Sequence, residues 1–167
     1  TFSLMLEVVD ITQVLEDAID LQVAQIKEKG LKLSLPEPHD PIIVHADPEK
    51  LKQVFLHVLS NAVKFTKLGG ISISVRVELG KNSASNGSAE SAIANSQSDW
   101  VVVTIEDTGV GIDPEQQQKL FQPFVMADGS TTREFGGNGL GLAISRRIME
   151  SMSGSITLNS AGVNQGT

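Results

Sequence analysis

Apolar residues recur at helical spacing in the first part of the sequence. Between residues 11 and 30 they fall three or four positions apart, which predicts an amphipathic helix with Asp10 as its N-cap and Gly30 as its terminator. A second such stretch follows Asp47-Pro48, an N-cap and a first-turn proline, and keeps one broad apolar face. We expect this second helix to end at Gly69-Gly70.

Alternation of apolar and polar residues indicates strands elsewhere. Prolines separate two short candidates, and two longer ones have the two-residue period of a half-buried strand. The four candidates are residues 31–35, 42–44, 71–77 and 100–106. We expect the last two to pair with each other.

A low-complexity run of Ser, Ala, Asn, Gly, Gln and acidic residues occupies positions 80–99, between the two longer strands. Such a run is too polar to bury and too small to pack. Because a strand resumes directly at Trp100, the run is predicted to be a loop inserted into a hairpin and not a boundary between domains. Residues 1–167 are therefore expected to form a single domain.

The last third of the sequence mixes helical and irregular segments. Residues 121–138 bear several glycines and predict irregular structure. Short helices are predicted at Pro114–Leu120 and Leu140–Met152, and a strand at Ser155–Leu158. Taken with the earlier elements, this order predicts a mixed α/β fold.

Composition narrows the classes of partner and compartment. A formal charge of -7 and a pI near 4.9 oppose binding to a nucleic-acid backbone. No apolar run approaches the roughly 20 residues that cross a bilayer. The absence of cysteine excludes disulfides and thiolate sites. We expect a soluble, cytoplasmic domain.

Three polar residues share one surface of the second helix. His57, Asn61 and Lys64 lie at i, i+4 and i+7, beside the apolar face. An amide oxygen suits Mg²⁺, and a lysine one turn further along can neutralise phosphate. Taken alone, the same stripe is also what an ordinary solvated helix face presents.

Two glycine-bearing segments complete the candidate chemistry. Asp107 follows a strand and precedes Gly109 and Gly111, so its carboxylate can face a pocket and accept a hydrogen bond from an exocyclic amine, although a plain turn has the same pattern. The run at 136–141 opens a helix, whose free N–H groups favour phosphate. Neither a P-loop nor a Gly-x-Gly-x-x-Gly strand–helix motif is present.

Together and in this order, the segments His57–Phe65, Asp107–Ile112 and Gly136–Leu142 resemble the N, G1 and G2 boxes of the catalytic ATP-binding domain of sensor histidine kinases. This domain belongs to the superfamily of type II topoisomerases and heat-shock chaperone ATPases. Phe121–Phe124 is similar to its F box. The resemblance implies the Bergerat fold, an α/β sandwich of a mixed β-sheet covered by helices, with ATP held under a mobile lid over residues 121–138.

The resemblance also assigns the nucleotide contacts. Asn61 would ligate Mg²⁺, Lys64 would contact phosphate, and Phe65 would line or stack on the adenine. The adenine amine would bind Asp107. The other positions of the pocket would be Gly109, Gly111, Ile112 and Thr167, the last supporting a bridging water.

Lid and G2 residues complete the implied site. Arg133 would belong to the lid. The G2 glycines, which would lie beside the phosphates, are Gly137, Gly139 and Gly141. Leu140 and Leu142 would pack with them.

The sequence departs from the family pattern at His57, where an asparagine is usual and where the hydrolysing relatives have a glutamate general base. An imidazole here could polarise water, ligate metal or make a structural hydrogen bond. We count His57 with Asn61 and Lys64 among the candidate catalytic residues.

The phosphoacceptor histidine of such kinases lies on a separate helical hairpin. His39 falls in a proline-rich loop and His45 precedes Ala46, so neither is expected to be the acceptor. The implied partners are the phosphoacceptor and dimerisation domain of the same longer protein and a response-regulator receiver. Whether that protein is of the hybrid type and whether it is membrane-anchored stay open alternatives. Because the sequence ends within the last motif, before a final strand, we expect a piece of a longer protein that is monomeric by itself.

The predicted function is binding of Mg-ATP and donation of its γ-phosphoryl group to that histidine in two-component signalling. Two alternatives stay open. One is a non-catalytic nucleotide sensor. The other is a self-contained ATP hydrolase, which would require a glutamate general base at the position that His57 occupies.

Overall fold

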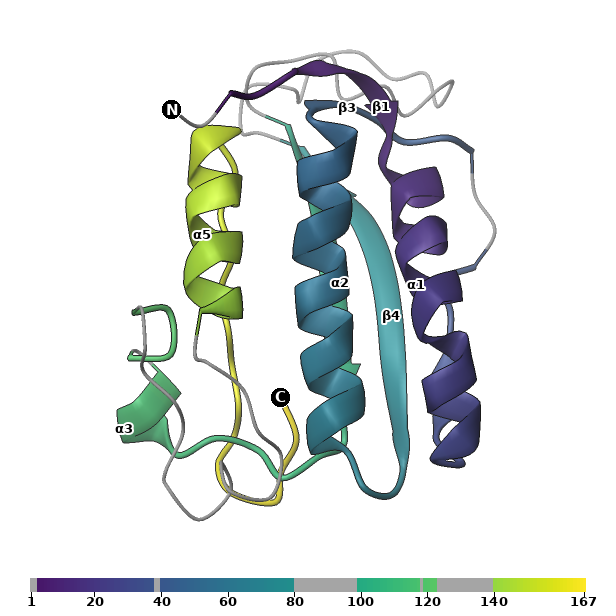
Figure 1. The fold of residues 1–167 in the computed structure, drawn as a ribbon, viewed down its shortest axis with the longest axis vertical. Coiled ribbons are helices and arrows are strands. Elements are labelled where there is room, and N and C mark those ends of the chain that lie inside the picture. Colours follow the sequence, from purple (N-terminus) through teal and green to yellow (C-terminus); the bar gives the residue numbers. More distant parts are fainter. Residues whose placement is uncertain (1–2, 38–39, 80–98, 118, 123–139) are drawn as a thin grey trace.

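The computed structural model describes residues 3–37, 40–79, 99–117, 119–122 and 140–167. Helices α1, α2 and α5 lie side by side in one layer, and the sheet that contains β4 lies behind them (Figure 1). This arrangement confirms the predicted α/β sandwich of a mixed sheet covered by helices.

The main sheet has the strand order β2-β4-β5, with bounds Lys32–Ser34, Gly70–Glu78 and Trp100–Asp107. β2 pairs with β4 in parallel, and β4 pairs with β5 antiparallel, as expected for the two longer strands. Alternation along β4 turns Ile71 and Ile73 into the core, while Ser72 and Ser74 are exposed. Of the loop predicted at residues 80–99, residues 80–98 lie outside the described residues.

Helix α1 spans Ile11–Glu28 and begins at the predicted cap. Asp10 Oδ1 accepts hydrogen bonds from the Thr12 amide at 3.0 Å and the Thr12 hydroxyl at 2.6 Å. The chain leaves the helix through Gly30 at a φ of +67°, a conformation that suits glycine.

Helix α2 spans Pro48–Phe65, with the predicted N-cap at Asp47. Its end differs from the expectation, because it stops four residues before Gly69. The reason is a cap from another element. Lys29 Nζ donates to the carbonyls of Val63 at 2.6 Å, Lys64 at 3.2 Å and Thr66 at 3.3 Å, so the last carbonyls of the helix need no further turn.

A two-stranded antiparallel ribbon covers the ends of α1 and α2 (Figure 1). It pairs β1 (Glu7–Asp10) with β3 (Ile43–Ala46), and Val9 lies opposite Val44. The sequence pattern predicted β3 and missed β1. Four residues with two adjacent valines show no alternation, so their pairing with a distant strand has no local signal.

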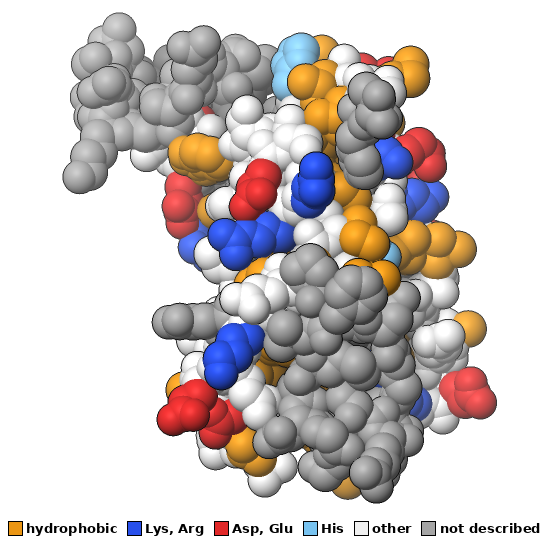
Figure 2. Space-filling model, turned by 60° about the vertical axis from the view of Figure 1, so that its left-hand side comes forward, with side chains coloured by type: hydrophobic (Ala, Val, Ile, Leu, Met, Phe, Trp, Pro, Cys, Tyr) orange, Lys and Arg blue, Asp and Glu red, His pale blue; other side chains and the backbone are white. Residues whose placement is uncertain are grey.

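The C-terminal helices are α3 (Pro114–Gln117) and α5 (Gly141–Ser151). α5 packs against α2 and buries Ser145 and Ile148. On the face turned forward in Figure 2, basic and acidic side chains are interspersed. On α5 itself, Arg146 and Glu150 form an ion pair of 2.8 Å between successive turns.

The strand predicted at Ser155–Leu158 is not formed among the described residues, and this prediction is wrong. Its side chains do alternate, with Ile156 and Leu158 more buried than their neighbours. A strand also needs a partner for its backbone groups, and β5 is the edge of the described sheet. The alternation therefore indicated correctly that every second side chain is partly buried, but it did not show that the backbone pairs with another strand.

The core lies between the helical layer and the sheet. Its least exposed apolar side chains come from α1, α2, β4 and α5, namely Leu15, Leu59, Val63, Ile71 and Ile148. Among the described residues, no helix has the length and apolar character needed to cross a bilayer.

Candidate functional site

His57 on α2 faces the beginning of α5. Its Nδ1 lies 3.0 Å from the Oγ atom of Ser145, whose side chain is 0% exposed. The imidazole ring also packs beside Gly141, where an added Cβ would lie 3.7 Å from the ring. Of the roles open to His57, the structure shows the hydrogen bond that joins two helices.

Burial lowers the pKa of His57 below its usual value of 6.5, and a hydrogen bond with the Gly141 backbone partly opposes this shift. The ring is therefore held in its neutral form near pH 7. A neutral imidazole keeps one nitrogen able to accept a proton or a metal ion.

Asn61 lies one turn after His57 and is half-buried. Its amide has no hydrogen-bond partner within the described part of the chain. A half-buried amide without a protein partner is free to bind a ligand. The same part of the chain has no cluster of three or more His, Cys, Asp or Glu side chains that would hold a metal ion by themselves.

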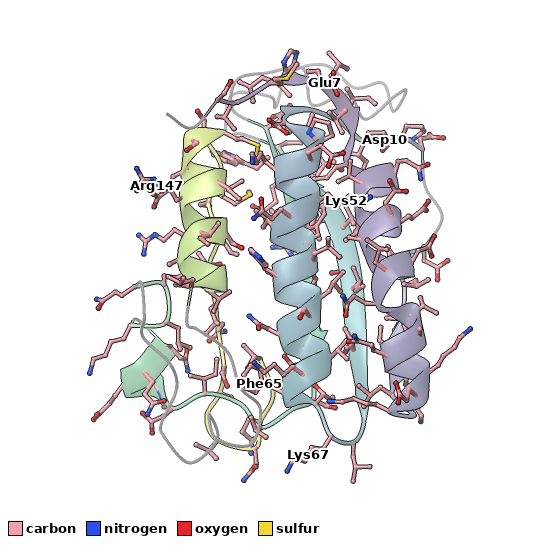
Figure 3. The ribbon with its side chains drawn as sticks, viewed as in Figure 1. Glu7, Asp10, Lys52, Phe65, Lys67 and Arg147 are labelled. Atoms are coloured by element: carbon pink, nitrogen blue, oxygen red, sulfur yellow. The ribbon has the colours of Figure 1, made fainter. Side chains whose placement is uncertain are left out.

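Lys64 and Phe65 form the last residues of α2. The Lys64 ammonium lies 5.2 Å from the centroid of the Phe65 ring, and both side chains are half-buried. Phe65 lies at the lower end of α2, away from the β1-β3 ribbon (Figure 3). Its carbonyl accepts a hydrogen bond from the Val110 amide at 3.1 Å, so the end of α2 is tied to the segment that follows β5.

Asp107 is the last residue of β5 and immediately precedes the segment that is tied to the end of α2. Its Oδ1 accepts the Gly109 amide at 2.8 Å, and its backbone exchanges two hydrogen bonds with Thr167 at 2.8 and 3.2 Å. Burial raises the pKa of Asp107 above 3.8, while hydrogen bonds from the Gly109 and Thr167 backbone and the nearby Thr66 hydroxyl oppose the rise. The carboxylate is thus half-buried and held by a backbone donor of the segment that follows β5.

The two G1 glycines are required by close packing within the protein. A Cβ at Gly109 would lie 2.5 Å from the Phe65 carbonyl oxygen and 2.7 Å from Asp107 Oδ1. Gly111 has a φ of +65°, and a Cβ there would overlap the Gly162 carbonyl oxygen. These contacts hold the segment after β5 against α2 and against the C-terminal loop.

Two residues that the sequence did not point to fix that C-terminal loop. Ser160 Oγ accepts the Ile112 amide at 3.0 Å and donates to the Gly166 carbonyl at 2.5 Å. Gln117 Nε2 donates to the carbonyls of Ser160 at 2.7 Å and Ile112 at 3.1 Å. A lone serine and a lone glutamine carry no local signal, because their partners are distant in sequence.

Apart from His57, the predicted site residues fall into three groups. In the first group, Phe65, Asp107 and Gly109 approach one another at the end of α2, whose last turns also carry Asn61 and Lys64, with Gly111, Ile112 and Thr167 in the adjoining loops. A second group begins α5, where Leu140 precedes the helix and Gly141 and Leu142 open it. The third group, Arg133, Gly137 and Gly139, lies outside the described residues, as does the predicted lid beyond Gln122.

An open hollow of about 820 Å³ lies beside Asp107, against the ends of the main strands. It is lined by Leu33, Gly70, Asp107 and Thr167 among others, and α2 contributes no residue to it. The hollow therefore includes Asp107 and Thr167 of the candidate site. The α2 surface that carries Asn61 and Lys64 lies outside it.

The family model described as histidine kinase-, DNA gyrase B- and HSP90-like ATPase matches residues 46–167. The chain belongs to this family. The match includes α2, the Asp107 corner and α5, and it leaves out α1 and most of the β1-β3 ribbon.

Curated relatives within the family are histidine kinases. Hybrid signal transduction histidine kinase A of Dictyostelium discoideum is 37% identical over 147 residues, which are 88% of this chain and 6% of that protein. Signal transduction histidine-protein kinase BarA of Escherichia coli (strain K12) is 36% identical over 147 residues, 87% of this chain and 14% of that protein. The chain therefore spans a small part of the relatives it matches.

Solved structures show the same fold. Full-length ShkA in complex with AMPPNP superposes with a TM-score of 0.71 at 29% identity, over 99% of this chain and 30% of that chain. The catalytic domain of the histidine kinase ThkA superposes with a TM-score of 0.62 at 21% identity, over 89% of this chain and 82% of that chain. The fold is that of histidine kinase ATP-binding domains.

Proposed function

We propose that this chain binds Mg-ATP at the C-terminal end of α2 and presents the γ-phosphoryl group to a histidine on a separate phosphoacceptor and dimerisation domain. The observation that supports this proposal is the close approach of the end of α2 to the segment after β5. The Val110 amide donates to the Phe65 carbonyl at 3.1 Å, and an added Cβ at Gly109 would lie 2.5 Å from that carbonyl oxygen and 2.7 Å from Asp107 Oδ1. The ShkA structure, which contains AMPPNP, an analogue of ATP, supports the choice of nucleotide.

The base would bind between Phe65 and Asp107. An aromatic ring offers a stacking surface, and a carboxylate accepts a hydrogen bond from the exocyclic amine of adenine. Guanine presents a carbonyl at that position, which would face the carboxylate without a proton between them. The site residues therefore fit an adenine nucleotide.

Phosphate and metal would bind further along the same helix. Lys64 supplies a positive charge, and the Asn61 amide, which has no partner among the described residues, supplies an oxygen ligand for Mg²⁺. Mg²⁺ would neutralise charge on the phosphates, which also complete its coordination. One protein ligand fits this cation better than a closed all-protein site, because Mg²⁺ usually keeps several waters.

Transfer of the phosphoryl group would depend on positioning. A bond forms between the acceptor histidine nitrogen and the γ-phosphorus while the bond to the bridging oxygen breaks and ADP leaves. Arg133, Gly137, Gly139, Gly141 and the leucines at 140 and 142 are proposed to enclose the phosphates. Because the relatives are hybrid histidine kinases, we propose a receiver domain as the next acceptor and a cytoplasmic location for this domain.

The hydrolase alternative has less support. A general base must reach an attacking water, and the Nδ1 atom of the half-buried His57 already lies 3.0 Å from the Ser145 hydroxyl of α5. The sensor alternative shares every binding residue with the kinase, so only a transfer assay separates the two.

Calorimetric titration with ADP and AMPPNP, with and without Mg²⁺, tests nucleotide binding. Asp107→Asn should abolish measurable binding, and Asn61→Ala should remove most of the Mg²⁺ dependence. Ser60→Ala, which alters the exposed neighbour of Asn61 on the same helix, is the matched control and should bind like the wild type. A folded wild-type protein that binds neither nucleotide would contradict the proposal.

Transfer is tested by adding radiolabelled ATP and a separately purified phosphoacceptor hairpin of a histidine kinase. We expect label on the hairpin histidine only when this chain is present. Binding without transfer to any hairpin would favour the sensor, and release of inorganic phosphate without a hairpin would favour the hydrolase.

A further inference from the structure

Thr66 has a buried hydroxyl that the packing of the protein does not explain. Its side chain is 0% exposed, and Oγ1 has no hydrogen-bond partner of good geometry within the described part of the chain. A valine would fill the same space without an unpaired polar atom, which is costly to bury. The hydroxyl therefore requires a role other than filling the core.

The position of Thr66 is fixed on both sides. Its carbonyl accepts Lys29 Nζ at 3.3 Å, and the carbonyl of the preceding Phe65 accepts the Val110 amide at 3.1 Å. The backbone leaves α2 here in an extended conformation, with φ of -102° and ψ of 116°. The side chain is thus held in place at the point where α2 meets the end of β5.

Asp107 is the polar group that this hydroxyl can reach. The Thr66 side chain lies close enough to its carboxyl to favour the ionised form, although the distance and angle fall short of a regular hydrogen bond. The one short side-chain contact of the carboxylate uses Oδ1 and the Gly109 amide. A small rotation of either side chain would bring the hydroxyl into line with the carboxylate.

We propose that Thr66 is a positioning residue whose buried hydroxyl donates a hydrogen bond to the Asp107 carboxylate and fixes it as the acceptor for the amine of an adenine base. This inference rests on the proposed function. An ionised carboxylate accepts at both oxygens, whereas the protonated form turns one oxygen into an O–H donor, which a base amine cannot pair with. Thr66 thereby supports both the orientation of Asp107 and the selection of adenine over guanine.

Other charged groups near the corner belong to different elements. They are Lys29 after α1, Lys64 and Lys67 at the end of α2, and Glu106, which is exposed and precedes Asp107 on β5. The pKa of Asp107 is set by burial and hydrogen bonds. Loss of the Thr66 hydroxyl should therefore raise this pKa, since a cause that lowers it is removed.

The test compares Thr66→Val, which removes the hydroxyl, with Thr66→Ser, which keeps it. Carbon NMR titration of the Asp107 carboxyl in the free protein should show a raised pKa in the valine variant and a wild-type pKa in the serine variant. Calorimetry should show nucleotide affinity about tenfold weaker for the valine variant, the scale of one hydrogen bond to a charged group. Discrimination against GDP should fall with it.

Urea unfolding provides the third readout. Because the buried hydroxyl lacks a hydrogen bond of regular geometry within the described part of the chain, Thr66→Val should be about as stable as the wild type. A folded valine variant with a wild-type Asp107 titration or wild-type affinity would overturn the proposal, and so would a valine variant that does not fold. If the wild type binds no adenine nucleotide, the proposed function fails, and the titration of Asp107 still decides the contact with Thr66.

Discussion

His57 Nδ1 and Ser145 Oγ lie 3.0 Å apart and join α2 to α5. Ser145 is 0% exposed, so its hydroxyl depends on this contact. The candidate catalytic position of the sequence is thus also a structural connection between the helix that carries Asn61 and the helix that follows the predicted lid.

Removing His57 should destabilise the fold. His57→Ala leaves a buried hydroxyl without its partner, which costs about 1–3 kcal/mol, and urea unfolding measures the loss. In the double variant with Ser145→Ala, the buried hydroxyl that needs a partner is gone as well. The double variant should therefore lose less unfolding free energy than the sum of the losses of the two single variants. Additive losses would show that the two side chains do not interact.

Stability should also fall in mild acid because of His57. Its pKa in the folded protein is below 6.5, so the unfolded chain takes up a proton first as pH falls. The contribution is fully present above 6.5 and is lost progressively below it. Between pH 8 and pH 5.5, His57→Asn should lose less stability than the wild type.

His45 on β3 is exposed and supplies the control for that comparison. His45→Asn removes a histidine without touching the contact between α2 and α5. The stability of His45→Asn should fall with pH as that of the wild type does. If His45→Asn and His57→Asn had the same pH dependence of stability, the assignment to His57 would be contradicted.

Asp107→Asn should abolish nucleotide binding and stabilise the free protein. Burial raises the pKa of Asp107 above its unfolded value, so the folded state disfavours the charge at neutral pH. The gain should be present at pH 7 and vanish below pH 3.8, where both states are protonated. Glu106→Gln removes the same charge from the exposed neighbour and should change neither property.

Lys29 should contribute to stability through its contacts with the end of α2. Lys29→Met removes the donor to the carbonyls of Val63, Lys64 and Thr66, and we expect a loss of about 1 kcal/mol in urea unfolding. Lys27→Met, in the last turn of α1, is the control. A similar loss in both variants would mean that helix charge, and not the cap, is responsible.

Gly111→Ala should cost more than Gly30→Ala, although the two glycines have φ values of +65° and +67°. The backbone penalty is the same at both, roughly 1 kcal/mol. A Cβ at Gly30 meets open space, whereas at Gly111 it would overlap the Gly162 carbonyl oxygen. Thermal unfolding should therefore rank the variants clearly, and equal losses would contradict the close contact.

Local chemistry made much of the fold predictable. Caps at Asp10 and Asp47 and the periods of the apolar residues placed α1, α2, β4 and β5, because those signals act within a few residues. The end of α2 was misplaced because its cap, Lys29, comes from another element. The strand at Ser155–Leu158 was wrong because alternation reports burial and not pairing.

The candidate site divides in the same way. The sequence by itself determined the residue types at each position and the stripe of His57, Asn61 and Lys64, since helical geometry fixes which side chains share a face. Only the tertiary structure decided that Thr66 faces Asp107, that His57 is joined to Ser145, and that Ser160 and Gln117 hold the loops together. Those contacts depend on how the chain brings distant segments into van der Waals and hydrogen-bond range, which no local pattern encodes.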